Sequence, residues 1–198
     1  MIKWLWDNKY DREDFLYWIE PNSYFKEKIS ELKPWKILLP WDWEWRNWVF
    51  AAKKWWDVYS FDWSIIWKQK ALNLADKNNL KIDYKVWSFK DISYQENFFD
   101  CIVLTYTHFI KHSNNEYTDF LNKYLKKWWF IILEWFSKSH FWREWWPKNI
   151  DMLYTLGDIE NDFKDYRIIE LEEKNTILNE WIWHSWRSIV IRLFWQKI

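Results

Sequence analysis

Short apolar runs alternate with longer amphipathic stretches through the first two thirds of the chain. Runs of aliphatic, β-branched and aromatic residues between polar or proline-containing turns are typical of buried strands. Strands are expected at Lys36–Leu39, Asp57–Phe61, Lys81–Val86, Cys101–Thr105 and Phe130–Leu133. Because strands that alternate with helices form parallel sheets, the pattern predicts an α/β fold.

The stretches between the strands carry apolar residues at helical spacing. Ser64 is of a residue type preferred at helix N-caps, so a helix is expected to begin there and to run to about Asn78. The other expected helices are Asp11–Leu32 with an interruption near Pro21, Arg46–Lys54, Asn114–Lys126, Ile150–Leu156 and Asp158–Phe163.

The last third of the chain departs from this alternation. Tyr166–Leu171 and Ser188–Phe194 both have the composition of strands, and the segment between them, Glu172–Arg187, shows no helical pattern. Two such strands in succession predict an antiparallel edge on a mostly parallel sheet. Because no repeat or low-complexity linker divides the chain, residues 1–198 are interpreted as a single domain.

Charge and cysteine content narrow the class of protein. The 29 basic and 29 acidic residues cancel, which gives no support to a nucleic-acid or membrane surface as the main partner. Cys101 is the single cysteine, so an internal disulfide is excluded and a reducing, cytoplasmic location is expected. The first ten residues carry charge too early for a signal peptide, and no apolar run approaches the ~20 residues of a membrane span.

Glycine and tryptophan occur in unusual numbers. Gly157 is the only glycine, where an average composition would give roughly 14, and tryptophan occurs 23 times. Glycine is the usual residue where a turn or a helix C-terminus needs a positive φ. Tryptophan stands at several such positions: Trp35 after Pro34, Trp41, Trp43 and Trp45 after the first strand, Trp128 and Trp129 after a helical segment, and Trp145 and Trp146 before Pro147.

These positions suggest that many tryptophans replace glycines of the natural protein. A UGA codon, read as tryptophan under one genetic code and glycine under another, would produce this pattern. The alternative is a truly tryptophan-rich protein whose indoles form a stacking surface for sugars or aromatic ligands. Trp6, Trp56 and Trp183 stand where an aromatic residue is reasonable, and Trp63 fits either interpretation.

A glycine-rich bend is the first candidate site. With glycine at positions 41, 43 and 45, residues 37–47 read Ile-Leu-Leu-Pro-Gly-Asp-Gly-Glu-Gly-Arg-Asn, a strand that enters a flexible bend and then a helix. Such a bend lets a ligand approach the backbone amides at the helix N-terminus. Asp62 ends the next strand, where a carboxylate can accept hydrogen bonds from both ribose hydroxyls. The glycine-rich bend and Asp62 together predict a nucleoside-type cofactor.

The spacing of this bend disfavours a dinucleotide. A pyrophosphate-binding turn has the pattern Gly-x-Gly-x-x-Gly, whereas this bend has Gly-x-Gly-x-Gly with carboxylates at Asp42 and Glu44. Two carboxylates would repel a pyrophosphate, but they suit a ligand that carries an ammonium and a sulfonium group.

The sequence with glycines restored resembles small class I S-adenosylmethionine-dependent methyltransferases, in the branch related to tellurite-resistance and thiopurine methyltransferases. The resemblance extends almost end to end. The segments that carry it are Trp6–Tyr10, Glu44–Asn47, Asp57–Asp62, Lys126–Trp129, Glu134–Lys138, Trp145–Pro147 and His184–Trp186. Leu39 departs from the pattern, because many relatives have an aspartate there.

The resemblance implies a Rossmann-like, mostly parallel seven-stranded sheet in the order 3-2-1-4-5-7-6, with the last strand antiparallel and helices on both sides. Residues 1–34 would cover the site. Loop 41–45 would face the methionine part of the cofactor, Asp62 the ribose and Ser88 with Phe89 the adenine, while Thr105 and Tyr106 would border the methyl group. The expected cofactor-binding residues are Trp41, Asp42, Trp43, Glu44, Trp45, Asn47, Asp62, Trp63, Ser88, Phe89 and Thr105.

The expected reaction is in-line methyl transfer from S-adenosylmethionine to a small molecule such as a thiol, an oxyanion like tellurite, or a similar metabolite. Catalytic candidates are Tyr106, His108, Arg46 and His184, and further acceptor-side candidates are His140, Arg143 and Arg187. Basic groups there would favour an anionic acceptor. No metal is expected, since His108 and His112 have no convincing third ligand. A nucleotide-binding oxidoreductase and a non-enzymatic tryptophan-rich binding protein remain alternatives.

Overall fold

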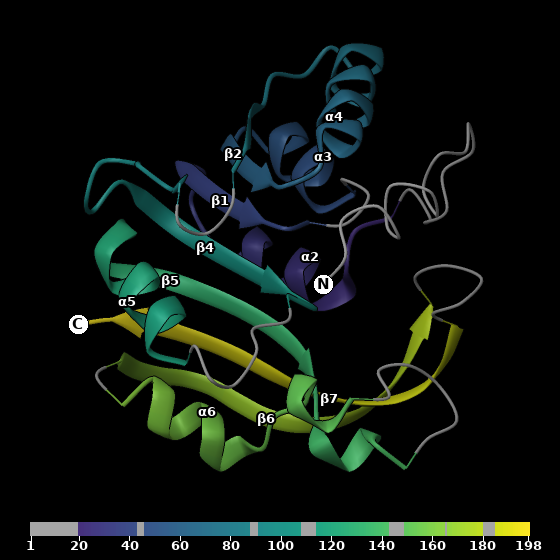
Figure 1. Cartoon of the computed structure of the whole chain (residues 1–198), viewed down its shortest axis with the longest axis vertical. Helices are drawn as coiled ribbons and strands as arrows, with labels where there is room; N and C mark the ends of the chain where they lie inside the picture. Colours follow the sequence, from purple (N-terminus) through teal and green to yellow (C-terminus); the bar gives the residue numbers. More distant parts are fainter. Residues whose placement is uncertain are drawn as a thin grey trace.

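A seven-stranded sheet forms the centre of the computed structural model, which describes residues 20–42, 46–87, 91–107, 114–142, 149–164, 166–179 and 185–198 (Figure 1). Its strands are β1 (Lys36–Pro40), β2 (Asp57–Asp62), β3 (Asp83–Val86), β4 (Phe99–Thr105), β5 (Leu125–Phe136), β6 (Tyr166–Asn179) and β7 (Ser185–Lys197). The strand order is β3-β2-β1-β4-β5-β7-β6. Strands β1 to β5 pair in parallel, and β7 is antiparallel to both β5 and β6. The expected sheet order is therefore confirmed.

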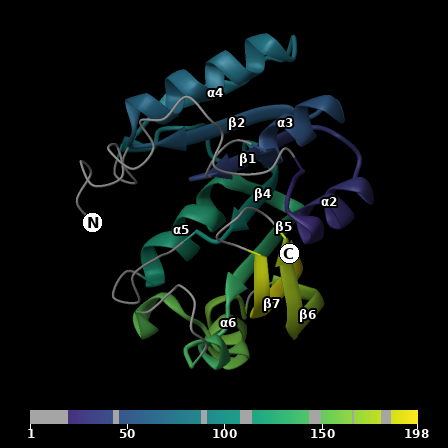
Figure 2. The same cartoon turned by 90° about the vertical axis from the view of Figure 1, so that its right-hand side faces the viewer.

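Helices cover both faces of the sheet (Figures 1 and 2). They are α2 (Ser23–Ser30), α3 (Arg46–Lys53), α4 (Ile65–Lys77), α5 (Asn114–Tyr124) and α6 (Leu156–Asp162), with short 3-10 turns η3 (Lys138–His140) and η4 (Ile150–Met152). Buried residues of α2, α3 and α4 form one apolar cluster with the sheet, and those of α5 and α6 form another. The domain is thus a three-layer α/β/α sandwich.

The side chains of the central strands point alternately to the two faces of the sheet, which gives one apolar cluster under each helical layer. Ile37 and Leu39 of β1 belong to the cluster under α2–α4, while Leu38 between them belongs to the cluster under α5 and α6. Successive side chains of a strand point to opposite faces, so a strand covered on both sides must be apolar throughout. This is why the first strand appears in the sequence as a continuous apolar run.

Several element boundaries differ from those expected. Ser64 caps α4 as predicted, its hydroxyl accepting a hydrogen bond from the Trp67 amide. The segment expected as one helix at Ile150–Leu156 instead contains the 3-10 turn η4, and Leu156 begins α6. Strands β6 and β7 extend through most of Glu172–Arg187, because an edge ribbon tolerates charged residues on its solvent side.

Three tryptophans have the left-handed backbone conformation that favours glycine. In the part of the chain that the structure describes, φ is +50° at Trp41, +67° at Trp55 and +68° at Trp128. This conformation costs a residue with a Cβ about 1–2 kcal/mol. Trp41 and Trp128 confirm the expectation of positive φ, and sequence analysis missed Trp55.

Two expectations about turns are wrong. Trp35 has no positive φ, so Pro34-Trp35 is not the centre of a type II turn. Trp128 does not end a helix, because α5 ends at Tyr124 and Trp128 lies in β5. There the pairing with β4 steps from Phe99↔Leu125 to Cys101↔Phe130, so the extra residues of β5 bulge out of the ladder.

The remaining tryptophans singled out in the sequence behave differently from one another. Trp56 is 5% exposed and belongs to the core, as expected of a genuine aromatic residue. Trp63 is 37% exposed and has no positive φ. Trp6, Trp183, Trp145 and Trp146 lie outside the described residues. No helix within the described ranges is long and apolar enough to cross a membrane.

Candidate functional site at the carboxyl ends of the strands

The carboxyl ends of β1 and β2 bring two of the expected site residues together. Pro40 pairs with Phe61, and the amide of the next residue, Trp41, donates to the Phe61 carbonyl at 3.0 Å. Asp62 follows Phe61 and is fully buried, and its Oδ1 accepts a hydrogen bond of 3.0 Å from the Ser64 amide. A carboxylate and a sharp backbone bend therefore lie side by side where ligands bind in open α/β sheets.

The indole of Trp41 occupies part of this position. Its ring centroid lies 4.8 Å from that of Phe61 in an edge-to-face arrangement, and it packs against the apolar cluster beneath α5 and α6. A glycine at this position would relieve the strain of its positive φ and leave the space of the indole open to a ligand. The Trp41 side chain therefore fills space beside Asp62 that glycine would leave empty.

Asp42 is directed toward α3. Its Oδ1 accepts a hydrogen bond of 2.6 Å from Asn47 Nδ2, and its Oδ2 accepts one of 3.2 Å from the Trp48 amide. Burial raises the pKa of Asp42 to about 6, even though the hydrogen bond from Asn47 lowers it. The side chain thus caps the amino end of α3 with a carboxylate that titrates near neutral pH.

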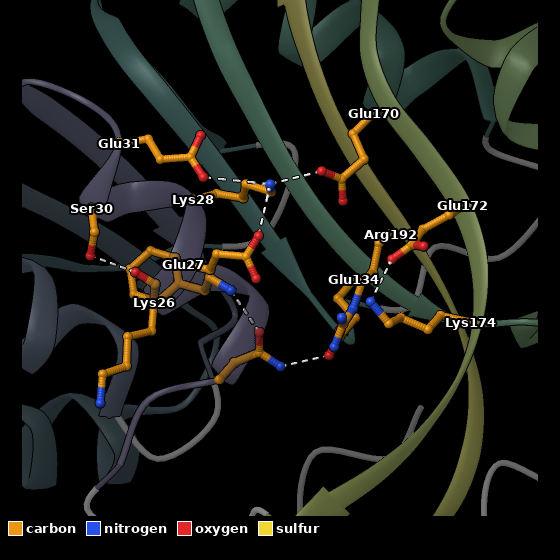
Figure 3. Close-up of polar contacts among 12 residues, drawn as sticks. Lys26, Glu27, Lys28, Ser30, Glu31, Glu134, Glu170, Glu172, Lys174 and Arg192 are labelled. Carbon is orange, nitrogen blue, oxygen red and sulfur yellow. Dashed lines mark hydrogen bonds and ion pairs between the residues drawn. The ribbon is translucent and has the colours of Figure 1, made fainter.

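A second polar cluster surrounds Glu134, near the carboxyl end of β5. Glu134 is 1% exposed, and its Oε1 accepts hydrogen bonds from the Tyr106 hydroxyl at 2.6 Å and from Asn22 Nδ2 at 2.7 Å. Its Oε2 accepts one of 2.7 Å from Arg192 Nε (Figure 3). We call Asn22, Tyr106, Glu134 and Arg192 the Glu134 cluster. Three donors, one of them a guanidinium, compensate the cost of burying this carboxylate.

Sequence analysis missed three members of the Glu134 cluster. Glu134 and Arg192 each interrupt an apolar strand, and a charge in a buried strand indicates a paired group. The two charges were visible in the sequence, but only the pairing of β5 with β7 shows that Glu134 and Arg192 are partners. Nothing in the sequence marked Asn22 as a site residue except its position directly after Pro21. Tyr106, which was expected, is buried, has a φ of +50° and stacks on Phe136.

The other expected residues divide into three groups. Arg46 and Asn47 are buried at the start of α3, and Thr105 pairs with Glu134 across β4 and β5. His140 is buried against Phe136, away from the bend, and its Nδ1 accepts a hydrogen bond of 3.4 Å from the Ile189 amide. Arg187 is exposed. Trp43, Glu44, Trp45, Ser88, Phe89, His108, His112, Arg143 and His184 lie outside the described residues.

The described residues hold no group of three or more His, Cys, Asp or Glu side chains placed to bind a metal ion. The polar groups described above lie at the carboxyl ends of β1, β2, β4 and β5. Asp62 and Trp41 form one group, and the Glu134 cluster forms the other.

Comparison with known proteins places this site in a familiar fold. No family model matches the chain, and no curated protein matches it significantly. Among solved structures, a SAM-dependent methyltransferase from Methanosarcina mazei is 13% identical, with a TM-score of 0.70 over 90% of this chain and 99% of that chain. TehB from Haemophilus influenzae is 16% identical, with a TM-score of 0.68 over 98% of this chain and 66% of that chain.

The cyclase SpnF is similar as well, with 11% identity and a TM-score of 0.67 over 94% of this chain and 87% of that chain. Identities this low establish a shared fold and nothing more specific. The fold is the Rossmann-like class I methyltransferase fold. Since one of its members is named for a cyclisation, the reaction must be argued from the site.

Proposed function

We propose that this protein transfers a methyl group from S-adenosylmethionine to a small-molecule acceptor. The observation that carries the proposal is the buried Asp62 carboxylate beside the left-handed bend at Trp41. A carboxylate at the end of the second strand suits the hydroxyls of a ribose, and a bend without side chains suits close approach of a ligand to the backbone. The similarity to structures named as SAM-dependent methyltransferases supports the same cofactor.

Apart from the indole of Trp41, the described residues fit this cofactor in their chemistry. Asp62 would hold the ribose, and the bend that begins at Trp41 would hold the methionine part. S-adenosylmethionine supplies an already activated methyl group on a sulfonium, so the protein has mainly to orient the acceptor and exclude water. Orientation can contribute up to about 7–11 kcal/mol in well-aligned reactions. Tyr106, held by Glu134, would border the transfer side.

The acceptor is proposed to be a thiol or an oxyanion such as tellurite, in keeping with the resemblance of the sequence. An oxyanion or a thiol of low pKa is a nucleophilic anion near neutral pH and needs no general base. Arg192 is compensated by Glu134, so it adds little net positive charge for an anionic acceptor. The positive groups would then come from Arg46 or from residues outside the described ranges, such as His108 and His184.

We also infer that Trp41, Trp55 and Trp128 replace glycines of the natural protein. The support is their positive φ, which three tryptophans share with two asparagines and Tyr106 among the described residues. Asparagine accepts this conformation more readily than residues with larger side chains. The nucleotide sequence tests the inference directly: UGA codons at these positions would support it, and UGG codons would contradict it.

Titration calorimetry tests the cofactor. The full chain and a variant carrying Trp41→Gly, Trp43→Gly and Trp45→Gly, called the three-glycine variant below, are titrated with S-adenosylhomocysteine and with NAD. We expect the three-glycine variant to bind S-adenosylhomocysteine and neither protein to bind NAD. Heat from NAD alone would instead support the oxidoreductase alternative, and the methyltransferase proposal would be abandoned.

The acceptor is tested separately with the three-glycine variant. S-adenosylmethionine is supplied with tellurite, with thiophenol or with a neutral alcohol, and formation of S-adenosylhomocysteine is followed. We expect turnover with at least one of the two anionic acceptors and none with the alcohol. Turnover with the alcohol alone would contradict the proposed acceptor class while leaving the cofactor assignment intact.

A further inference from the structure

Asn22 connects two parts of the site that are far apart in the sequence. It is fully buried, and its side-chain amide donates to Glu134 at 2.7 Å. Its backbone amide donates to Asn47 Oδ1 at 2.8 Å, and its own Oδ1 accepts from the Phe25 amide at 2.9 Å as the N-cap of α2. One residue therefore contacts α3, α2 and β5 through hydrogen bonds in three directions.

These contacts are part of a longer chain of hydrogen bonds. Asn47 Nδ2 donates to Asp42, the residue after the bend at Trp41, and Glu134 accepts from Tyr106 after β4. The chain runs from Asp42 through Asn47 and Asn22 to Glu134 and ends at Tyr106. It joins the side of the site assigned to the cofactor with the side assigned to methyl transfer.

Helix α2 is held in place by other contacts as well. Lys28 forms ion pairs with Glu170 of β6 at 2.7 Å and with Glu27 at 2.9 Å (Figure 3). Its ammonium also lies over the rings of Tyr24 and Phe194. Phe25 and Ile29 are buried in the core. Helix α2 therefore has anchors other than the buried polar contacts of Asn22.

We propose that Asn22 is a positioning residue, which keeps Glu134 and Tyr106 in register with the bend after β1. The proposal rests on the proposed methyl transfer. A displacement of about 1 Å between reacting groups can reduce a rate by about a hundredfold. A residue that fixes the distance between donor and acceptor sides should therefore affect the rate of transfer more than the binding of the cofactor.

Asn22→Ser separates this role from helix capping. Serine is also a good N-cap and can accept from the Phe25 amide, but its hydroxyl is too short to reach Glu134 as the asparagine amide does. Lys28→Met is the matched control, because it removes an anchor of α2 without touching the hydrogen-bond chain. Both substitutions are made in the full chain and in the three-glycine variant.

Amide hydrogen exchange provides a readout that does not depend on catalysis. The Trp48 amide donates to Asp42 and the Tyr106 amide to the Glu134 carbonyl, at opposite ends of the chain of hydrogen bonds. We expect Asn22→Ser to speed exchange of both amides about tenfold, while Lys28→Met speeds exchange within α2 only. Unchanged exchange at either amide in Asn22→Ser would overturn the proposal.

Kinetics in the three-glycine variant provide the second readout. We expect Asn22→Ser to lower kcat with thiophenol or tellurite about tenfold or more and to leave the Kd for S-adenosylhomocysteine within about threefold. Lys28→Met should lower Tm but not kcat. An equal loss of kcat in both variants would overturn the proposal. If no protein binds S-adenosylhomocysteine, the proposed function fails, and the exchange of the two amides still decides whether Asn22 couples the two sides.

Discussion

The two ends of the parallel sheet carry similar backbone strain in very different surroundings. At the amino ends of β2 and β5, Trp55 and Trp128 have positive φ and side chains that are 88% and 62% exposed. At the carboxyl end of β1, Trp41 has the same conformation, but its indole packs on Phe61 beside the buried Asp62. We therefore expect the strained tryptophans at the amino end to affect only stability, whereas the indole of Trp41 also fills space at the proposed cofactor position.

Buried carboxylates differ in the same way between the two ends. Asp100 at the amino end is 1% exposed and accepts from Lys126 Nζ at 2.7 Å and from the Lys36 amide at 3.1 Å. Asp42 at the carboxyl end accepts from an amide side chain and a backbone amide, and burial raises its pKa to about 6. Lys126 donates a hydrogen bond directly to the first carboxylate, whereas the hydrogen bonds to the second come from neutral amides, with the charge of Arg46 as a further stabilising influence. Perturbed carboxyl groups of the second kind are typical of functional sites.

The largest effect is expected from the bend itself. Glycine at 41, 43 and 45 should improve affinity for S-adenosylhomocysteine by about a hundredfold or more, because it removes the Trp41 indole from the proposed ligand position and relaxes the left-handed backbone at residue 41. Calorimetry on both proteins measures the change. Tight binding by the chain with all three tryptophans would show that the indoles do not obstruct the site.

Asp42 should make stability depend on pH in an unusual direction. Because its folded-state pKa is about 6 and its ordinary value is 3.8, the folded protein keeps the proton over a range where the unfolded chain has lost it. Its contribution to stability is therefore present below about pH 4 and is lost as pH rises to 6, by about 3 kcal/mol at most. Urea unfolding of the parent and Asp42→Asn across this range should show a difference that changes with pH. If the free energies of unfolding of the two proteins changed with pH in the same way, the raised pKa of Asp42 would be contradicted.

Asp62 and Asp57 lie at opposite ends of the same strand and form a matched pair. Asp62→Asn in the three-glycine variant should weaken S-adenosylhomocysteine binding by about ten- to a hundredfold, the loss expected for a hydrogen bond to a charged group. Asp57→Asn, at the exposed amino end of β2, should leave the affinity unchanged. Equal affinities for the two variants would remove Asp62 from the binding site.

The smallest effect concerns the amino end of the sheet. Trp55 and Trp142 are both 88% exposed, but only Trp55 has a positive φ. Trp55→Gly should raise the free energy of unfolding by about 1 kcal/mol, because relief of backbone strain exceeds the entropic cost of glycine. Trp142→Gly should lower it by about 0.5–1 kcal/mol. Chemical denaturation measures both, and a loss of stability in both variants would contradict the glycine hypothesis at Trp55.

The sheet order was predictable because the central strands are covered on both faces. Lys36–Leu39 and Cys101–Thr105 are continuous apolar runs, and burial left little freedom in assigning them. The length of the β6–β7 ribbon was not predictable, since Glu172–Lys174 is a charged stretch without a strand pattern, although it pairs with the buried residues 190–192 of β7. The order itself came from the resemblance to a family, and the pairing observed in the structure confirms it.

The site was predictable only where its signal is local in sequence. Asp62 and the bend at Trp41 lie next to strand ends, so their neighbourhood follows from the parallel pairing of β1 and β2. Glu134, Arg192 and Asn22 come together across separations of 58 and 112 residues, and no local pattern contains that information. Tyr106 was expected at the site, but its hydrogen bond to Glu134 was not.

The position of β7 has a consequence for how the domain is assembled during synthesis. This strand comes last in the sequence but lies inside the sheet, between β5 and β6, and it carries the guanidinium that compensates Glu134. While the ribosome still holds these residues, β5 pairs with β4 alone and the carboxylate of Glu134 has no countercharge, a state that costs about 3–5 kcal/mol when a buried pair is broken. A chain shortened before β7 would therefore lose the partner of Glu134 together with the strand that joins β6 to the sheet.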